Sequence, residues 1–293
     1  MAEKDLTEKL LEDYNEVFAD IVNVLIFGGE QRIRPKDLQT KSVHSQYKAS
    51  NASLHEQERD VYKEWVPDGV GIALCGIENQ TKAENIMPLR VIGYDGASYR
   101  SQLLEKQQKK YMPVLTLVLY FGENHWTQPI TLKKVVDIPD ELDAYINDYK
   151  INVFEISWLS EEQVEMFQSD FKVVANFFVK KRKNKDYMPD DKTEIQHVDE
   201  VLKLLSVMTG DNRYAYILKD ENTEGKVTNM CDVATRLENK GRAEGRAEGR
   251  AEAFFELLKD GEISEETAIK KTGMERDEFR NAYLDWCAAN KEQ

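Results

Sequence analysis

Residues 58–80 have the sequence ERDVYKEWVPDGVGIALCGIENQ, which predicts two strands joined by a tight turn. The turn is Pro67-Asp68-Gly69. It combines a fixed φ, a side chain that bonds to nearby backbone and a residue that adopts positive φ freely. Runs on either side of such a turn pair antiparallel. This hairpin is the element around which we expect the rest of the fold to be arranged.

The register of the hairpin decides where its acidic residues lie. If Val66 faces Val70, then Asp60 lies opposite Gly76 and diagonal to Glu78 on one face. Diagonal neighbours are about 7–8 Å apart, a distance that two carboxylates span by sharing one hard cation such as Mg²⁺. A one-residue bulge would rotate the two acids apart.

Gln80 extends the same face, because it follows Glu78 by two residues in a strand. Residues 72–77 are apolar on both faces, which is typical of an interior strand. Glu78 then follows at the strand end where sites of open α/β sheets lie. The alternative interpretation is a solvated charge at a strand end. Residue type favours that alternative and position favours a metal ligand, so both stay open.

The composition is that of a globular protein. The chain has 293 residues, of which 41% are hydrophobic and 32% charged. No apolar run approaches the roughly 20 residues of a membrane helix, and residues 1–9 lack signal-peptide character. We therefore expect a cytoplasmic protein that does not act on membranes. Three widely spaced cysteines argue against a zinc site and a disulfide framework: Cys75, Cys231 and Cys287.

The charge distribution limits where DNA could bind. The net charge is −14, which weighs against a surface that binds phosphates everywhere. Residues 137–170 hold ten acids and one Lys, whereas residues 180–185 are KKRKNK. The smaller basic group is Lys106, Lys109 and Lys110. We expect any DNA contact to follow a basic track, unless the cluster is a plain solvated face, and its candidate residues are Lys180, Lys181 and Arg182.

Residues 5–27 have helical spacing, and Gly28-Gly29 ends the predicted helix. Asp20 and Asn23 interrupt its apolar second half three residues apart and share a face. Such a pair is either satisfied by its neighbours or part of a site. Residues 31–51 predict a polar connection with one short strand.

Beyond the hairpin, the sequence predicts alternating helices and strands at 85–108, 112–121, 151–159, 161–181 and 193–208. The helix at 85–108 and the buried strand at 112–121 form a crossover unit, which predicts a central parallel strand. Ser160 and Gln163 form a capping box before the helix at 161–181. The apolar stripe of that helix is typical of core packing.

The C-terminal region is predicted to be all helical. Residues 227–259 form one long helix that contains three consecutive Gly-Arg-Ala-Glu units. This repeat suits a spacer, or a surface that another helix approaches closely. Residues 263–286 predict two short helices that resemble a degenerate helix-turn-helix. Its recognition segment, residues 274–278, is acidic and therefore poorly suited to lie beside phosphates.

Several segments in order resemble a known family. They are Glu58-Arg59-Asp60-Val61, Gly76-Ile77-Glu78-Asn79-Gln80-Thr81, Met87-Pro88-Leu89-Arg90-Val91 with Tyr94-Asp95-Gly96, and Pro113-Val114 leading into Leu119-Tyr120-Phe121-Gly122 and Trp126. Together they resemble the recombination-promoting nuclease and putative transposase family of the PD-(D/E)XK nuclease superfamily. The resemblance covers roughly residues 15–181.

The resemblance implies an α/β fold with a restriction-endonuclease-like core of helix, three-stranded meander, helix and strand. It implies catalytic roles for Asp60, Glu78 and Gln80. Asp60, Glu78 and Asp20 would bind Mg²⁺, with Mn²⁺ as the alternative. Gln80 stands where the superfamily usually has Lys, and Arg59 precedes Asp60 in place of Pro. A neutral amide orients a water but does not neutralise phosphate charge.

The resemblance further implies a Mg²⁺-dependent endonuclease that hydrolyses duplex DNA, in which Arg90 contacts a phosphate. The alternative is a catalytically inactive nuclease-like scaffold that binds DNA or a protein. A toxin or defence effector would use the same chemistry, and a homo-oligomer stays open. We expect a nuclease-like domain, an accessory helical segment, a long helix and a small helical segment at residues 1–185, 186–225, 226–259 and 260–293.

Overall fold

The structure is a computed structural model that describes residues 10–41, 44–48, 54–58, 60–69, 71–104, 110–219 and 227–290. The chain divides into two compact units, residues 1–231 and residues 232–293. The finer division into four segments stays a prediction.

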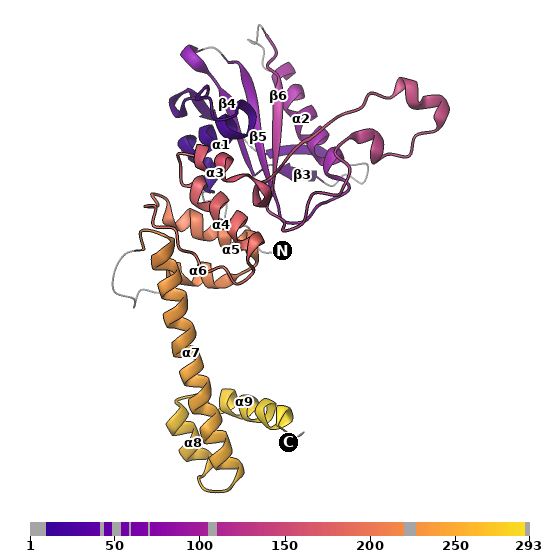
Figure 1. Cartoon of the computed structure of the whole chain (residues 1–293). Helices are drawn as coiled ribbons and strands as arrows, with labels where there is room; N and C mark the ends of the chain where they lie inside the picture. Colours follow the sequence, from indigo (N-terminus) through magenta and orange to yellow (C-terminus); the bar gives the residue numbers. More distant parts are fainter. Residues whose placement is uncertain are drawn as a thin grey trace. The chain divides into compact units, whose positions relative to one another are not determined.

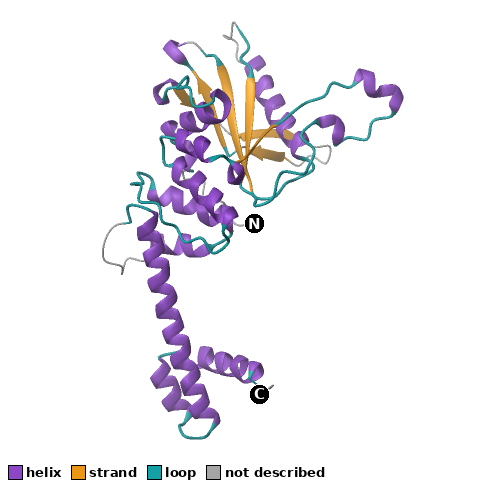
Figure 2. Cartoon of the chain, in the orientation of Figure 1, coloured by secondary structure: helices purple, strands orange, loops and turns teal. Residues whose placement is uncertain are grey.

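The first unit contains a five-stranded mixed sheet, drawn in orange in Figure 2. In spatial order its strands are β1 (Leu38–Thr40), β4 (Val61–Trp65), β5 (Ala73–Gln80), β6 (Val114–Tyr120) and β7 (Asn152–Glu155). β1, β4 and β5 form an antiparallel meander, and β6 and β7 continue the sheet parallel to β5. A separate antiparallel pair consists of β2 (His44–Lys48) and β3 (Leu54–Glu58). The predicted mixed α/β class is confirmed.

Helices cover both faces of the sheet (Figure 1). The helices of the first unit are α1 (Asn15–Phe27), α2 (Met87–Leu104), α3 (Glu161–Met166), α4 (Phe171–Lys183), α5 (Val198–Thr209) and α6 (Asn212–Lys219). On one face, Met87 and Val91 of α2 pack against Val118 of β6. On the other face, the fully buried Lys63 of β4 lies over the ring of Phe18 in α1. β5 therefore lies between two helical layers.

The predicted turn of the β4–β5 hairpin is confirmed. Asp68 and Gly69 have φ angles of 52° and 80°, so both adopt the left-handed conformation that the turn residues favour. The loop closes where the Ile72 amide donates to the carbonyl of Trp65 at 2.8 Å. Val70 and Arg59 lie outside the described residues, as do Lys106 and Lys109 of the smaller basic group.

The predicted register of this hairpin is wrong by two residues. Val61 pairs with Ile77, so the register, continued by one position, sets Asp60 opposite Glu78 and not Gly76. The cause is a longer loop, since β5 begins only at residue 73. Because the shift is an even number of residues, Asp60 and Glu78 still belong to the same face.

Two predicted helices have different limits in the structure. The helix expected from residue 5 begins only at Asn15, because Tyr14 is extended with φ −72° and ψ 127°, and residues 1–9 lie outside the described part. The helix expected at 161–181 is divided into α3 and α4. Its predicted capping box is confirmed, as Ser160 Oγ accepts the Gln163 amide at 3.2 Å.

Other predicted elements agree more closely. Gly28 ends α1 with a left-handed φ of 61°, and Gly210 ends α5 with a φ of 71°. The connection expected at 31–51 holds two strands, β1 and β2, where one was predicted. The helix expected at 85–108 is described to Leu104. The strand expected at 112–121 is the central parallel strand β6.

The second unit is helical, as predicted. The long helix α7 (Met230–Lys259) leads into it, and α8 (Glu265–Thr272) and α9 (Arg276–Ala289) follow. Ser264 caps α8 by accepting the Thr267 amide. The core of the unit consists of four buried residues, Ala251, Phe255, Ala268 and Phe279. Among the helices that the structure describes, none is both long and apolar enough to cross a lipid bilayer.

Candidate functional site

Glu78 lies at the carboxyl end of β5 and is 3% exposed. Its Oε1 accepts hydrogen bonds from Arg90 Nη2 and, at 3.2 Å, from Gln80 Nε2. Arg90 belongs to α2 and also donates to Glu84 Oε2 at 3.1 Å and to Tyr94 Oη at 3.2 Å. The structure therefore brings Glu78, Gln80 and Arg90 together, with the arginine between two acids.

The charges around Arg90 keep it protonated. Burial, the largest single effect, lowers the pKa of Arg90, but the contacts with Tyr94, Glu78 and Glu84 together raise it by more. The pKa of Arg90 therefore lies above its ordinary value. Burial also raises the pKa of Tyr94, and the charge of Glu78 adds to that shift. The site thus holds a permanent cation and a neutral phenol beside Glu78.

Asp60 immediately precedes β4, and its Oδ2 accepts the backbone amide of Asn79 at 2.7 Å. The bond fixes the Asp60 carboxylate beside the end of β5, one residue after Glu78. The charge of Asp60 also contributes to the raised pKa of Tyr94 in α2. Asp60, Glu78 and the α2 residues therefore occupy one end of the β4–β5 pair.

Glu12 is a neighbour of this site that the sequence reasoning missed. It is fully buried, and its Oε1 accepts Asn79 Nδ2 at 3.1 Å. Burial raises the pKa of Glu12 from 4.5 to about 7, and the charge of Asp60 acts in the same direction. In a continuous helix, Glu12 would lie about 200° from Leu10, on the polar face. Periodicity therefore gave no signal for it.

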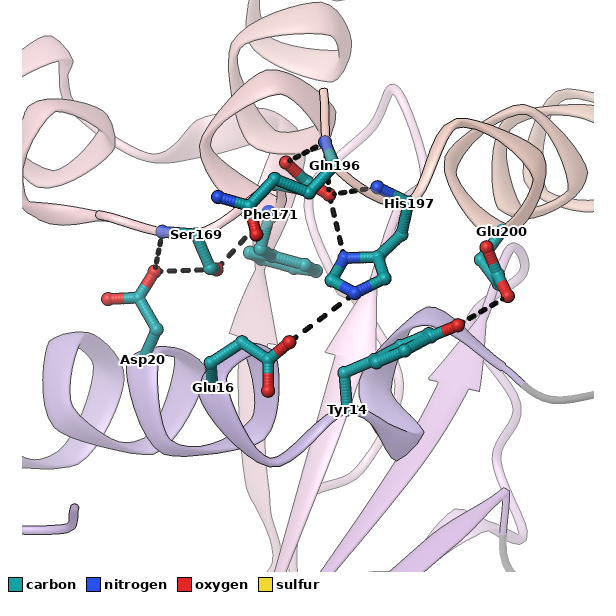
Figure 3. A network of polar contacts seen from close by, with 9 residues as sticks. Tyr14, Glu16, Asp20, Ser169, Phe171, Gln196, His197 and Glu200 are labelled. Atoms are coloured by element: carbon teal, nitrogen blue, oxygen red, sulfur yellow. Dashed lines mark hydrogen bonds and ion pairs between the residues drawn. The ribbon is translucent and has the colours of Figure 1, made fainter. Parts of the chain in front are cut away.

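Asp20 is held elsewhere, at the connection between α3 and α4. Its Oδ2 accepts the amides of Gln168 and Ser169, each at 2.8 Å, and the hydroxyl of Ser169 at 2.7 Å. These bonds stabilise the break between the two helices. Asn23, which shares the face, is satisfied by the Ile33 backbone, with its Oδ1 2.9 Å from the amide. Neighbours therefore hold both side chains in place (Figure 3 shows the contacts of Asp20 with Ser169), although Oδ1 of Asp20 is buried without a hydrogen-bond partner in the described part of the chain.

The three acids expected to bind a metal are thus not assembled together. Within the described ranges, no group of three or more His, Cys, Asp or Glu side chains is arranged to hold a metal ion. Lys63, the buried cation of β4, pairs with Cys75 and so points to the face opposite Glu78. It donates to the Asp13 carbonyl at 2.9 Å. Any ion at this site would depend on Asp60 and Glu78.

The basic cluster at the end of α4 is bonded within the chain. Lys180 forms an ion pair with Asp190 at 2.8 Å, and Lys181 donates to the Lys185 carbonyl at 2.8 Å. Arg182 lies 3.8 Å above the ring of Trp158. Its Nε also donates to a backbone carbonyl, that of residue 157. DNA binding by this cluster stays a prediction, and it would compete with these contacts.

The comparisons with known proteins give one match. A search of curated proteins and a search of solved structures each found no match. A family model with the description "Putative transposase, YhgA-like" matches residues 38–208, more than half of the chain. The matched region contains the β4–β5 hairpin, Glu78, Arg90 and α4. The chain therefore belongs to the YhgA-like putative transposase family.

Proposed function

We propose that the protein is a Mg²⁺-dependent DNA endonuclease that hydrolyses phosphodiester bonds, with Asp60 and Glu78 as the metal ligands. Family membership supports an enzyme that acts on nucleic acid. The observation that carries the proposal is the β4–β5 register, which, continued by one residue, sets Asp60 opposite Glu78. Residues directly opposite in an antiparallel pair share a face and lie close together.

The order of elements supports the same proposal. α1, the meander of β1, β4 and β5, then α2 and β6 follow the order of a restriction-endonuclease-like core. In that arrangement β5 carries the acid at its carboxyl end, where Glu78 stands. The restriction-endonuclease-like assignment is part of the proposal.

The residues present fit a hard divalent cation. Carboxylate oxygens are the ligands that Mg²⁺ prefers, and Asp60 and Glu78 supply them from adjoining strands. Arg90 donates a hydrogen bond to Oε1 of Glu78, so an ion bound to that oxygen would displace the arginine from it. Arg90 would keep Glu84 as a partner. When bound, Mg²⁺ would stabilise the negative charge that develops on the phosphoryl oxygens.

The remaining roles fall to Arg90 and Gln80. Arg90, released from Glu78, would present a positive charge to a phosphate, because a guanidinium stays protonated at neutral pH. Gln80 would orient a water through its amide without neutralising charge. In this proposal Arg90 supplies the positive charge that Lys usually supplies in the superfamily. Gln80 only positions a water.

The test is nicking of supercoiled plasmid by the full chain in Mg²⁺, in Mn²⁺ and in EDTA. We expect metal-dependent nicking that Asp60→Asn and Glu78→Gln each abolish. Glu84→Gln is the matched control, because Glu84 contacts the same arginine but is not a proposed ligand. Nicking that survives both ligand substitutions in a contaminant-free preparation would overturn the proposal.

A second candidate is an inactive nuclease-like scaffold that binds DNA. It is favoured by the ion pair that neutralises Glu78 and by the absence of a three-ligand metal group in the described ranges. This candidate predicts a mobility shift of duplex DNA that is equal in Mg²⁺ and EDTA, without nicking. Plasmid nicking and mobility shift, measured on the same preparation, therefore separate the two candidates.

A further inference from the structure

The three parallel strands β5, β6 and β7 end at the same level of the sheet. Their last residues are Gln80, Tyr120 and Glu155, and the register pairs Gln80 with Tyr120 and Tyr120 with Glu155. Paired residues point to one face, so Glu155 lies on the same face as Gln80 and Glu78. At about 4.8 Å per strand, the Cα atoms of Gln80 and Glu155 are about 10 Å apart. The end of β7 therefore continues the candidate site along the strand ends.

Glu155 ties the segment that follows β6 to the end of β7. Each of its carboxylate oxygens lies 3.2 Å from Nδ1 of His125. Its Oε1 also accepts the backbone amide of Trp126. The carboxylate is thus directed at donors of the segment after β6, and it holds one edge of the His125 ring in place.

His125, Trp158 and Arg182 form a stack of three planar groups. The rings of His125 and Trp158 are stacked, with centroids 3.6 Å apart and an interplanar angle of 25°. The guanidinium carbon of Arg182 lies 3.8 Å from the centroid of the Trp158 ring. Two groups so close to one ring centre lie on opposite faces of that ring, because they would overlap on the same face. Trp158 is therefore enclosed between an imidazole and a guanidinium.

The outer face of the His125 ring is the open end of this stack. The His125 side chain is 60% exposed, although one of its faces lies on Trp158. A flat ring that is already fixed in position accepts another flat group at a low entropic cost. Arg182, at the other end of the stack, belongs to the basic last turn of α4. Positive charge that attracts phosphates therefore lies next to the stack.

We propose that the outer face of His125 is a stacking site for an unpaired nucleobase of a DNA strand that lies along the ends of β5, β6 and β7. Aromatic side chains, His included, stack on unpaired bases of any sequence, because every base has a π face. A base inside an intact duplex is stacked on its neighbours and does not reach such a ring.

The position of the stack relates it to the proposed cleavage site. The separation of about 10 Å between Gln80 and Glu155 equals about three nucleotides at the rise of about 3.4 Å in duplex DNA. The inference rests on the proposed function for its ligand, DNA. It adds the substrate class, which is DNA with unpaired nucleotides close to the cleaved bond.

The test uses the full chain and an end-labelled thymidine tract that contains one 2-aminopurine, in EDTA and at one fixed salt concentration. Fluorescence anisotropy of the label gives the affinity, and quenching of 2-aminopurine reports stacking of that base. We expect saturable binding with quenching in the wild type. His125→Ala should weaken binding about tenfold, the size typical for one stacked base, and should remove the quenching. His125→Phe keeps a flat ring and should retain both.

Two controls separate stacking from other effects. Tyr145→Ala removes an aromatic ring that is 81% exposed in the same β6–β7 connection but is not part of the stack, so it should bind as the wild type does. A fully paired duplex should bind the wild type and His125→Ala equally, because its bases do not reach the ring. Circular dichroism checks that each variant is folded.

The proposal is overturned if the thymidine tract does not bind or its 2-aminopurine is not quenched, or if His125→Ala binds it as the wild type does. It is also overturned if His125→Phe loses as much affinity as His125→Ala, or if His125→Ala weakens duplex binding by the same factor. None of these readouts requires cleavage. Quenching without plasmid nicking would contradict the nuclease and support the stacking site, whereas nicking with unchanged binding by His125→Ala would do the reverse.

Discussion

Replacing Glu12 by Gln should make the first unit more stable at neutral pH. Glu12 is fully buried, and burial is the main cause of its raised pKa. Gln has nearly the same shape and keeps an oxygen that can accept the Asn79 Nδ2 hydrogen bond. The substitution therefore removes a buried titrating group with little change in packing.

The magnitude follows from the difference between the folded and unfolded pKa. In the folded chain the pKa of Glu12 is about 7, and the ordinary value is 4.5. Between these values the folded state keeps a proton that the unfolded state has released, so the free energy of unfolding falls as pH rises. One pKa unit corresponds to about 1.36 kcal/mol, so the total loss in the free energy of unfolding is about 3 kcal/mol. It is absent below the unfolded pKa and complete above the folded pKa.

The assay is urea unfolding of wild type and Glu12→Gln from about pH 4 to about pH 8 in EDTA, followed by tryptophan fluorescence. At the acidic end both proteins should have similar free energies of unfolding, because Glu12 is then protonated in both states. At the alkaline end the variant should be more stable by about 3 kcal/mol. Glu162→Gln, which changes an exposed acid, should follow the wild-type profile. Parallel profiles for wild type and Glu12→Gln would show that the pKa of Glu12 is the same in the folded and unfolded chains.

Three further substitutions test local packing by urea unfolding. Ser160→Ala removes the cap of α3 and should cost about 1 kcal/mol; no change would show that the capping box contributes nothing. Gly29→Ala should cost about 1 kcal/mol or more, because φ is +91° and the new Cβ would lie 3.2 Å from Met166 Sδ; a neutral result would contradict that conformation. Phe279→Ala empties a fully buried position in the second unit and should cost about 3 to 5 kcal/mol, measured by helical circular dichroism; a loss below about 1 kcal/mol would contradict the described core.

Local chemistry predicted several elements of the fold from the sequence. The turn at Pro67-Asp68-Gly69 has the expected positive φ at Gly69, and β6 is the buried parallel strand that its apolar run indicated. The capping box at Ser160 is present. These features depend on a few neighbouring residues, so a single sequence is enough to identify them.

Features set by distant contacts were beyond the sequence. The division of one predicted helix into α3 and α4 depends on Asp20, which is 148 positions away from Gln168. The β4–β5 register depended on the length of the loop, which turn chemistry alone does not fix. In both cases the local pattern was compatible with more than one arrangement, and tertiary packing selected among them.

In the candidate site, too, local sequence predicted one contact, whereas contacts between distant segments were not predicted. Gln80 lies beside Glu78, as the strand period of two predicted. The ion pair between Arg90 and Glu78 depends on how α2 packs on β5, and Glu12 enters the site only because the chain is extended at Tyr14. Neither the Arg90–Glu78 ion pair nor the position of Glu12 can be predicted from the spacing of residues in the sequence.

If Asp60 and Glu78 share one divalent ion, calorimetric titration of the full chain with Mg²⁺ detects that binding without relying on nuclease activity. We expect one saturable site in wild type and in Glu162→Gln, and loss of that site in Asp60→Asn and in Glu78→Gln. Heats that do not saturate in the wild type, or a site that persists in both ligand variants, would show that Asp60 and Glu78 do not share an ion.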